Sequence, residues 1–273
     1  MTVSIAPTVP INLRLSQRIL RETAYDGFFA LVVDGVQRIG KSSYVIKGLA
    51  FANGEWEYTP EPICVKPDYE SVKPWVVFKP EEFLDKVLEV DEKEKALIWD
   101  DAGYWLFSLD WYEPFVKAVS RWMQVAGTQF ASIILTTPER SLISSKVLAA
   151  LPNQYICHIM RQQSDTYLKR MRLAKAYQKW KYPDGRDGGV HIRWTDEFNA
   201  MLPDEIYDWY SPIRKGYLTL ARELMEQQVR KMQKKLSQKD ESEVMEKVYK
   251  VTGNRSKLQE VIEKIKNAEQ EQA

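Results

Sequence analysis

The chain has 273 residues, 44% of them hydrophobic, so it is long enough and apolar enough to bury a large core. Its formal net charge of +1 excludes a whole-chain electrostatic attraction to nucleic acid, so any basic surface must be local. The two cysteines and two histidines do not have the spacing of a disulfide framework or of a zinc site. No run approaches the roughly 18 consecutive apolar residues of a membrane span, and Met1–Pro10 lacks a signal-peptide pattern. We therefore expect a cytoplasmic protein without a membrane partner.

From residue 28 to residue 160, apolar runs of strand length alternate with amphipathic segments of helix length. This pattern predicts an α/β fold in which a parallel sheet is flanked by helices, preceded by an N-terminal extension at 1–27. The first strand is expected at Phe28–Val33, followed by a loop and by a helix that ends near Ala52. The next strand is either Pro62–Lys66 or Trp75–Phe78. The remaining predictions are a helix from Pro80, strands at Ala96–Trp99, Ala131–Leu135 and Gln154–Met160, and helices at Glu113–Ala126 and Ser141–Leu151.

After residue 160 the composition becomes basic. Arg161–Lys181 holds seven basic residues against one acidic residue, Asp165, and its period is ambiguous between a long strand and a helix. A turn precedes Val190–Trp194, which is typical of a returning strand. We therefore expect residues 161–239 to form a basic hairpin followed by a long helix, which runs from Asp204 to about Lys239. This helix belongs to a C-terminal helical appendage. A small tail at 240–273 contains two short helices, arranged either as a helix-turn-helix or as a plain helical hairpin.

One short motif carries a specific chemical meaning. The spacing of Gly35, Gly40, Lys41 and Ser42 is GxxxxGK[S/T], between the first strand and the helix after it. Such a loop points backbone N–H groups at a phosphate, the lysine reaches the β- and γ-phosphates, and the serine hydroxyl holds Mg²⁺. The sequence therefore predicts a site for ATP and Mg²⁺. The expected nucleotide-binding residues are Gly35, Val36, Gln37, Arg38, Ile39, Gly40, Lys41, Ser42 and Ser43.

A second motif supplies the acids that such a site needs. In "ALIWDDAG" an apolar strand ends at Asp100, at the edge where ligands bind in open α/β sheets. We expect Asp100 to bind Mg²⁺ together with Ser42, and Asp101 to act as the base or as the group that positions the attacking water.

With these motifs, residues 28–160 resemble the P-loop ATPases that carry an additional catalytic acid. That acid is usually a glutamate in the family, whereas here it is Asp101, which is one methylene shorter. The resemblance implies a polar sensor at the end of a neighbouring strand, matched by Thr136 or Thr137. It also implies an arginine supplied by a neighbouring subunit, for which Arg140, Arg161 and Arg121 are the candidates in that order, and hence a homo-oligomer such as a ring.

The wider layout is similar to DNA-pumping and Zot-like ATPases and to ATPases encoded by archaeal viruses and plasmids. A member encoded by a virus would work in the cytoplasm of the host cell. The similarity implies action on DNA, in replication, partition or packaging. The basic stretch would follow a phosphate backbone through Lys169, Arg170, Arg172, Lys175 and Lys179, unless these side chains are merely solvated. The alternatives are an ATP-gated scaffold that binds no nucleic acid and a small-molecule P-loop kinase.

Overall fold

The computed structural model describes residues 13–58, 62–110, 113–151, 154–163, 165–166, 169–181 and 187–217, with scattered positions between 219 and 233. The chain divides into two units, Met1–Ile206 and Tyr207–Ala273. Residues 204–217 are helical, so the predicted long helix begins where expected. Its predicted end and the two-helix tail at 240–273 lie outside the described residues. Within the described part, no helix combines the length and the apolar character needed to cross a membrane.

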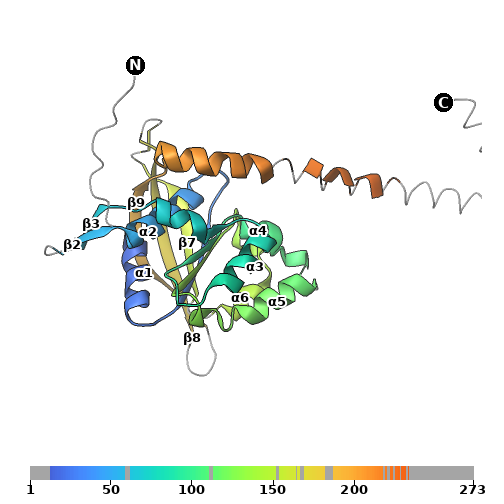
Figure 1. Ribbon diagram of the computed structural model, residues 1–273, viewed down its shortest axis with the longest axis horizontal. Helices are drawn as coiled ribbons and strands as arrows, with labels where there is room; N and C mark the ends of the chain where they lie inside the picture. Colours follow the sequence, from blue (N-terminus) through green and yellow to red (C-terminus); the bar gives the residue numbers. More distant parts are fainter. Residues whose placement is uncertain are drawn as a thin grey trace, which may run out of the picture. The chain divides into compact units, whose positions relative to one another are not determined.

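A seven-stranded sheet forms the centre of the first unit, in the order β4-β5-β6-β1-β7-β8-β9 (Figure 1). Strand β1 (Phe29–Asp34) lies in the middle and pairs in parallel with β6 and β7, while β8 and β9 extend the sheet as antiparallel strands. The predicted fold class is confirmed by this mostly parallel sheet and the helices that flank it. The other six strands are β4 (Val76–Val77), β5 (Leu97–Trp99), β6 (Ser132–Thr136), β7 (Gln154–Arg161), β8 (Met171–Lys181) and β9 (Asp187–Asn199).

Helices cover both faces of the sheet. Helices α1 (Arg14–Ala24) and α2 (Lys41–Asn53) lie together on one face, where a Cβ on Gly48 would come within 2.5 Å of Leu15, so the small residue allows their close approach (Figure 1). The opposite face packs against the other helices in one apolar cluster, in which Phe83 stacks on Trp99 with 4.4 Å between ring centroids. The helices on that face are α3 (Pro80–Glu89), α5 (Pro114–Trp122) and α6 (Ser145–Ala150), with the short α4 (Ala102–Trp105) after β5.

Several elements differ from their sequence-based expectations. Both candidates for the second strand are strands: β3 (Pro62–Lys66) pairs with β2 (Glu55–Tyr58) in a separate hairpin, whereas Val76–Val77 joins the main sheet. The ambiguous basic stretch is resolved as strand β8, and the returning strand β9 is confirmed. Helix α1 was not predicted, because its segment was assigned to an extension.

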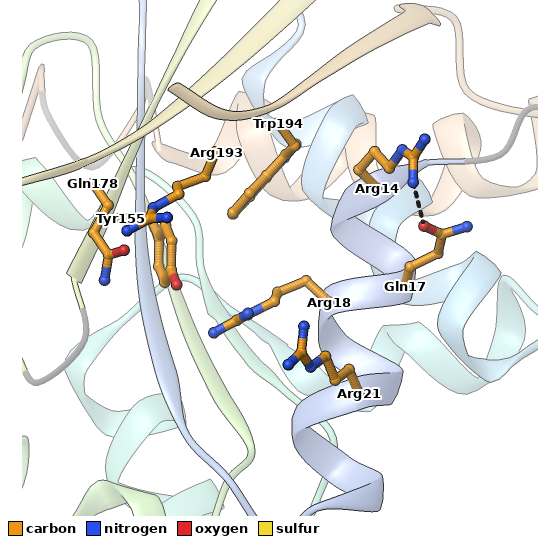
Figure 2. Close-up of a pocket in the computed structure, with 8 residues that line it drawn as sticks. All are labelled: Arg14, Gln17, Arg18, Arg21, Tyr155, Gln178, Arg193 and Trp194. Atoms are coloured by element: carbon orange, nitrogen blue, oxygen red, sulfur yellow. Dashed lines mark hydrogen bonds between the residues drawn. The ribbon is translucent and has the colours of Figure 1, made fainter. Parts of the chain in front are cut away.

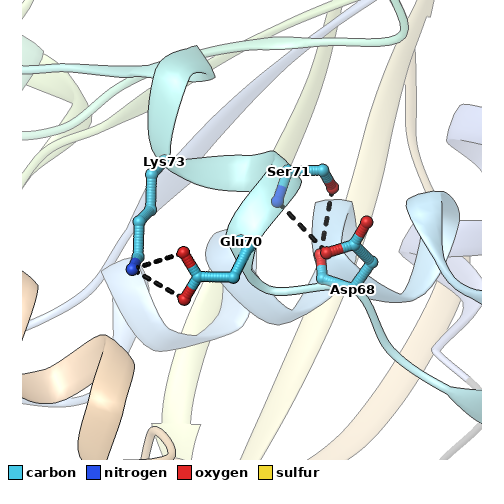
Figure 3. Close-up of polar contacts among 4 residues, drawn as sticks. All are labelled: Asp68, Glu70, Ser71 and Lys73. Carbon is cyan, nitrogen blue, oxygen red and sulfur yellow. Dashed lines mark hydrogen bonds and ion pairs between the residues drawn. The ribbon is translucent and has the colours of Figure 1, made fainter.

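A short turn of 3₁₀-helix, η1 (Glu70–Trp75), leads from the β2–β3 hairpin to β4. Its start is fixed by Asp68, whose side chain accepts the Ser71 N–H at 3.1 Å and whose carbonyl accepts the Ser71 hydroxyl (Figure 3). The Asp68 N–H in turn donates to Ala50 in α2. This capped turn therefore sets where β4 begins beside β5, while the exposed Lys73–Glu70 ion pair next to it contributes little.

Candidate nucleotide-binding site

The predicted phosphate loop connects the carboxyl end of β1 to the first residue of α2. Gly35 and Gly40 have φ angles of +143° and +110°, which side-chain-bearing residues rarely adopt. A Cβ on Gly35 would also come within 2.7 Å of the Ile159 carbonyl oxygen. The two glycines are therefore required by the shape of the loop and not only by the motif.

Lys41 is 5% exposed and folds back over the loop. Its ammonium group donates hydrogen bonds to the carbonyl oxygens of Gly35, at 2.9 Å, and Val36, at 3.2 Å. A positive charge is thus held within the loop, next to the N-terminus of α2, where an anion is favoured.

Asp100 follows β5 and is only 1% exposed. Its Oδ1 atom accepts a hydrogen bond from the Ser42 hydroxyl at 2.8 Å and another from the Thr136 hydroxyl at 2.6 Å. The three side chains come from α2, the end of β5 and the end of β6, and they meet because parallel strands end at the same edge of the sheet. Three of the predicted site residues are therefore in direct contact.

Asp101 is half-buried and adopts a left-handed conformation with φ +51°, as the residue before α4. Its backbone N–H donates to the Thr136 hydroxyl oxygen at 2.8 Å, so one threonine contacts both members of the acid pair. Aspartate tolerates this conformation better than most residues, and such conformations gather at functional sites.

The other two predicted catalytic residues, Thr137 and Arg140, follow β6 at the same edge of the sheet, but they contact other groups than Asp100 in the described part of the chain. The Thr137 hydroxyl donates to the Glu139 carbonyl oxygen at 2.9 Å. A Cβ on Gly103 would come within 2.3 Å of the Thr137 hydroxyl oxygen. Arg140 is half-buried in η4 (Arg140–Leu142), and its Nε is buried with no hydrogen-bond partner among the described residues. Of the two candidate sensors, Thr136 is therefore the one that touches Asp100.

The remaining loop residues differ in their exposure. Val36, Gln37 and Arg38 are exposed at the tip of the loop, Arg38 with φ +61°. Ile39 is buried, and Ser43 is half-buried in the first turn of α2. The tip of the loop is thus its most exposed part.

The β8–β9 hairpin supports the loop from behind, which the sequence did not predict. Arg172, 7% exposed, donates from Nε to the Ile39 carbonyl oxygen at 2.8 Å and forms an ion pair with Asp165 at 2.7 Å. The Lys47 ammonium donates to the Asn199 carbonyl oxygen at 2.6 Å. The alternation of Arg172 with Ala174 and Ala176 on one face of a strand is the signal that could have placed Arg172 inside.

This position changes the predicted nucleic-acid surface. Arg172 holds the loop instead of facing solvent, so its guanidinium is not available to a nucleic-acid backbone. Lys169 and Arg170 are exposed just before β8, and Lys175 is half-buried on the opposite face of the strand from Arg172. Lys179 belongs to β8, but its side chain lies outside the described part of the chain.

Asp196 on β9 connects α1 and α2. Its carboxylate accepts the backbone N–H groups of Arg14, at 2.7 Å, and Leu15, and so caps α1, while the Tyr44 hydroxyl donates to it at 2.7 Å. Burial raises the pKa of Asp196, and these hydrogen bonds oppose that effect. Trp194 also donates to the Tyr44 hydroxyl, at 3.1 Å. These polar contacts therefore join β9 to Tyr44 in the first turn of α2, just after the phosphate loop.

The buried Lys47 predicts a pH-dependent stability. Burial lowers its pKa to about 8, whereas the unfolded chain keeps the ordinary value of 10.5. Between these values the unfolded state binds more protons, so this residue makes the free energy of unfolding rise with pH, by at most about 3 kcal/mol. In urea titrations at pH 7, 8.5 and 10, the difference in unfolding free energy between wild type and Lys47→Met should grow in favour of wild type as pH rises. A difference that does not change with pH would contradict the prediction.

Comparisons with known proteins add a viral relative. No protein-family model matches the chain. It is 21% identical over 233 residues, 75% of this chain and 81% of the relative, to uncharacterized protein B-251 of Sulfolobus spindle-shape virus 1. Two solved structures are similar at 12% identity. One is the N-terminal domain of zonular occludens toxin from Neisseria meningitidis, with a TM-score of 0.28 over 67% of this chain and 98% of that chain. The other is the genome packaging NTPase B204 from Sulfolobus turreted icosahedral virus 2 in complex with ATP-gammaS, with a TM-score of 0.30 over 61% and 96%. At these TM-scores neither likeness bears on function.

Proposed function

We propose that this protein binds ATP with Mg²⁺ and hydrolyses it at the carboxyl edge of its sheet. The observation that carries the proposal is the meeting of Ser42 and Thr136 on one carboxylate oxygen of Asp100, beside a loop that holds the Lys41 ammonium. A phosphate loop with its lysine, and a loop serine in contact with a buried strand-end acid, are among the parts with which P-loop enzymes transfer a phosphoryl group to water.

The residues present fit a magnesium ion. The Ser42 hydroxyl and the Asp100 carboxylate are oxygen donors, which Mg²⁺ prefers, and they already lie 2.8 Å apart. When bound, the ion supplies positive charge at the β- and γ-phosphates. Ser42 and Asp100 would hold it, while Lys41 adds a second positive charge on the loop side.

The remaining roles follow from position. Asp101 is next to the metal-binding acid and half-buried, so its carboxylate can orient an attacking water and accept its proton. Thr136 fixes both acids through its hydroxyl. Arg140 is proposed to stabilise the charge that develops on the phosphate at the site of a neighbouring subunit, which makes the working form an oligomer.

We further propose that the protein uses ATP hydrolysis to act on DNA. Lys169 and Arg170 are exposed at the turn before β8, and Lys175 follows on the strand, so a local basic surface exists in a chain of near-zero net charge. Turnover of ATP measured with and without single- and double-stranded DNA tests this part. Stimulation by DNA supports it, turnover without any DNA effect favours the scaffold, and turnover that needs a small acceptor favours the kinase.

Lys41→Ala tests the nucleotide site itself. Because the ammonium group lies within the loop, where it donates to the Gly35 and Val36 carbonyl oxygens, and contributes charge to the phosphates, its loss should lower ATP affinity and turnover by at least about 100-fold. The thermal unfolding midpoint without nucleotide should stay close to that of wild type. Isothermal titration with ATP and Mg²⁺ provides the measurement. An unchanged ATP affinity in a folded variant would remove the phosphate-loop assignment.

A further inference from the structure

A basic pocket of about 410 Å³ lies away from the nucleotide site, between α1 and strands β7, β8 and β9 (Figure 2). Tyr155, the second residue of β7, forms part of its wall and pairs with Gln178 near the end of β8. The pocket is therefore at the amino ends of the parallel strands, whereas the phosphate loop follows the carboxyl end of β1. It is a separate site and not an extension of the first one.

The pocket lining is rich in positive charge. Among the described residues that line it are four arginines and no acidic residue: Arg14, Arg18 and Arg21 come from successive turns of α1, and Arg193 comes from β9 (Figure 2). Arg21 and Arg193 are exposed. Four like charges gathered in one hollow repel one another, and an anion relieves that repulsion.

Arg18 at the centre points to a ligand more directly. One arm of its guanidinium pairs with Glu22 at 2.8 Å, and the group lies 5.2 Å from the centroid of the Tyr155 ring. Its Nε is nevertheless buried without a hydrogen-bond partner among the described residues. A buried guanidinium N–H that lacks an acceptor is costly, and a phosphate oxygen is the acceptor that suits arginine best.

Aromatic side chains lie among these arginines. The Trp194 ring is 5.2 Å from the Tyr155 ring, and its indole N–H donates to the Tyr44 hydroxyl at 3.1 Å, which fixes its orientation. Trp194 is half-buried, so part of the indole is accessible from the pocket. Cations alternating with a fixed aromatic face are the combination that binds single-stranded nucleic acid, in which phosphates contact the cations and bases stack.

We propose that this arginine pocket, defined by Arg14, Arg18, Arg21, Arg193, Tyr155 and Trp194, binds a segment of single-stranded nucleic acid. Phosphodiester groups contact the arginines, and one base stacks on Trp194. A volume of about 410 Å³ suits one nucleotide unit and is too small for a duplex. The proposal rests on the DNA action proposed above, to which it adds a second contact surface, separate from Lys169 and Arg170, and a preference for single strands.

The test measures binding of fluorescent oligo(dT) to the full chain by polarisation, over a series of salt concentrations. The variant Arg21→Gln/Arg193→Gln removes two exposed charges from the pocket. The matched control Lys117→Gln/Arg121→Gln removes two exposed charges from α5, which covers the other face of the sheet. The pocket variant should bind about 10-fold more weakly at low salt, with a salt slope shallower by about 1.4, while the control stays within about twofold of wild type.

Two further measurements separate the possible ligands. Thymidine monophosphate and inorganic triphosphate serve as competitors. Both should compete far less well than the oligonucleotide, because the monophosphate carries only one of the phosphates that contact the arginines and the triphosphate carries no base to stack on Trp194. A bromouridine-substituted strand is cross-linked by light, and peptides are identified by mass spectrometry. Cross-links should fall on peptides that contain Tyr155 or Trp194, a result that does not depend on how the variants fold.

The outcomes distinguish this proposal from the broader one. If wild type binds the strand and the pocket variant binds equally well, the pocket is not the site, although DNA action survives. A monophosphate that competes as strongly as the oligonucleotide would reassign the pocket to free nucleotides. If the pocket variant changes only the oligomer mass, the arginines contact another copy of the chain. If wild type binds no DNA at low salt, both proposals fail, while ATP turnover stands or falls separately with Lys41→Ala.

Discussion

Asp100→Asn is expected to lower Mg²⁺-dependent ATP turnover by about 1000-fold, which corresponds to about 4 kcal/mol of lost transition-state stabilisation. The amide keeps the volume of the buried side chain but removes the negative charge that holds the metal ion. It can still accept hydrogen bonds from Ser42 and Thr136 through its oxygen, so the surrounding contacts persist. The apparent affinity for Mg²⁺ should therefore fall together with turnover.

Asp101→Asn should behave differently. This residue is proposed to position water, so the loss of its charge acts mainly in the transition state and slows turnover by about 100-fold or more while ATP affinity changes little. Asp85→Asn, the same chemical change at an exposed position of α3, is the control and should match wild type. Steady-state turnover and nucleotide titrations on all four proteins provide the comparison. Wild-type turnover in Asp101→Asn would place the base elsewhere.

Arg172→Met is expected to destabilise the protein by about 3 kcal/mol, because it leaves the Ile39 carbonyl and the partly buried Asp165 without their partner. The methionine fills much of the same space, so the lost polar contacts dominate. Since Ile39 belongs to the phosphate loop, ATP affinity should also fall, by about 10-fold. Urea titration measures the first effect and nucleotide titration the second.

Arg161→Met is the matched control for this change. Arg161 is the register partner of Arg172 across β7 and β8 but is exposed, so its loss should change the unfolding free energy by less than about 0.5 kcal/mol. If Arg172 instead contacted DNA, as its place in a basic stretch suggests, its variant would lose DNA affinity at unchanged stability. That result would contradict the supporting role seen in the structure.

The sequence was most informative where one local pattern decides the structure. The apolar runs before Gly35 and Asp100 are long enough to define buried strands, and the phosphate-loop spacing fixes what lies between β1 and α2. Contacts between residues far apart in the sequence could not be predicted from such local patterns. Nothing near Arg172 reveals that its partner is the Ile39 carbonyl, 133 residues away. Alternation along β8 becomes visible only once the segment is known to be a strand, because basic side chains carry no apolar period.

Helix α1 shows the same limit for a different reason. Its amphipathic segment is short, and its first N–H groups are capped by Asp196 instead of by a neighbouring residue, so no capping signal precedes it. The arginine pocket depends on this helix and on β9 together. Four arginines separated by up to 179 positions form a cluster only after the chain has folded.

The capping of α1 by Asp196 also has a consequence for synthesis on the ribosome. The two partners are separated by 182 residues, so at translation rates of roughly 5–20 residues per second the helix emerges roughly 10–40 s before the carboxylate that completes it. During that interval the apolar side chains Leu15 and Ile19, fully buried in the finished protein, have no completed β9 beside them. Helix α1 is therefore fully capped only after most of the described chain has been made, and a nascent chain that stalls before residue 196 exposes this helix to chaperones and proteases.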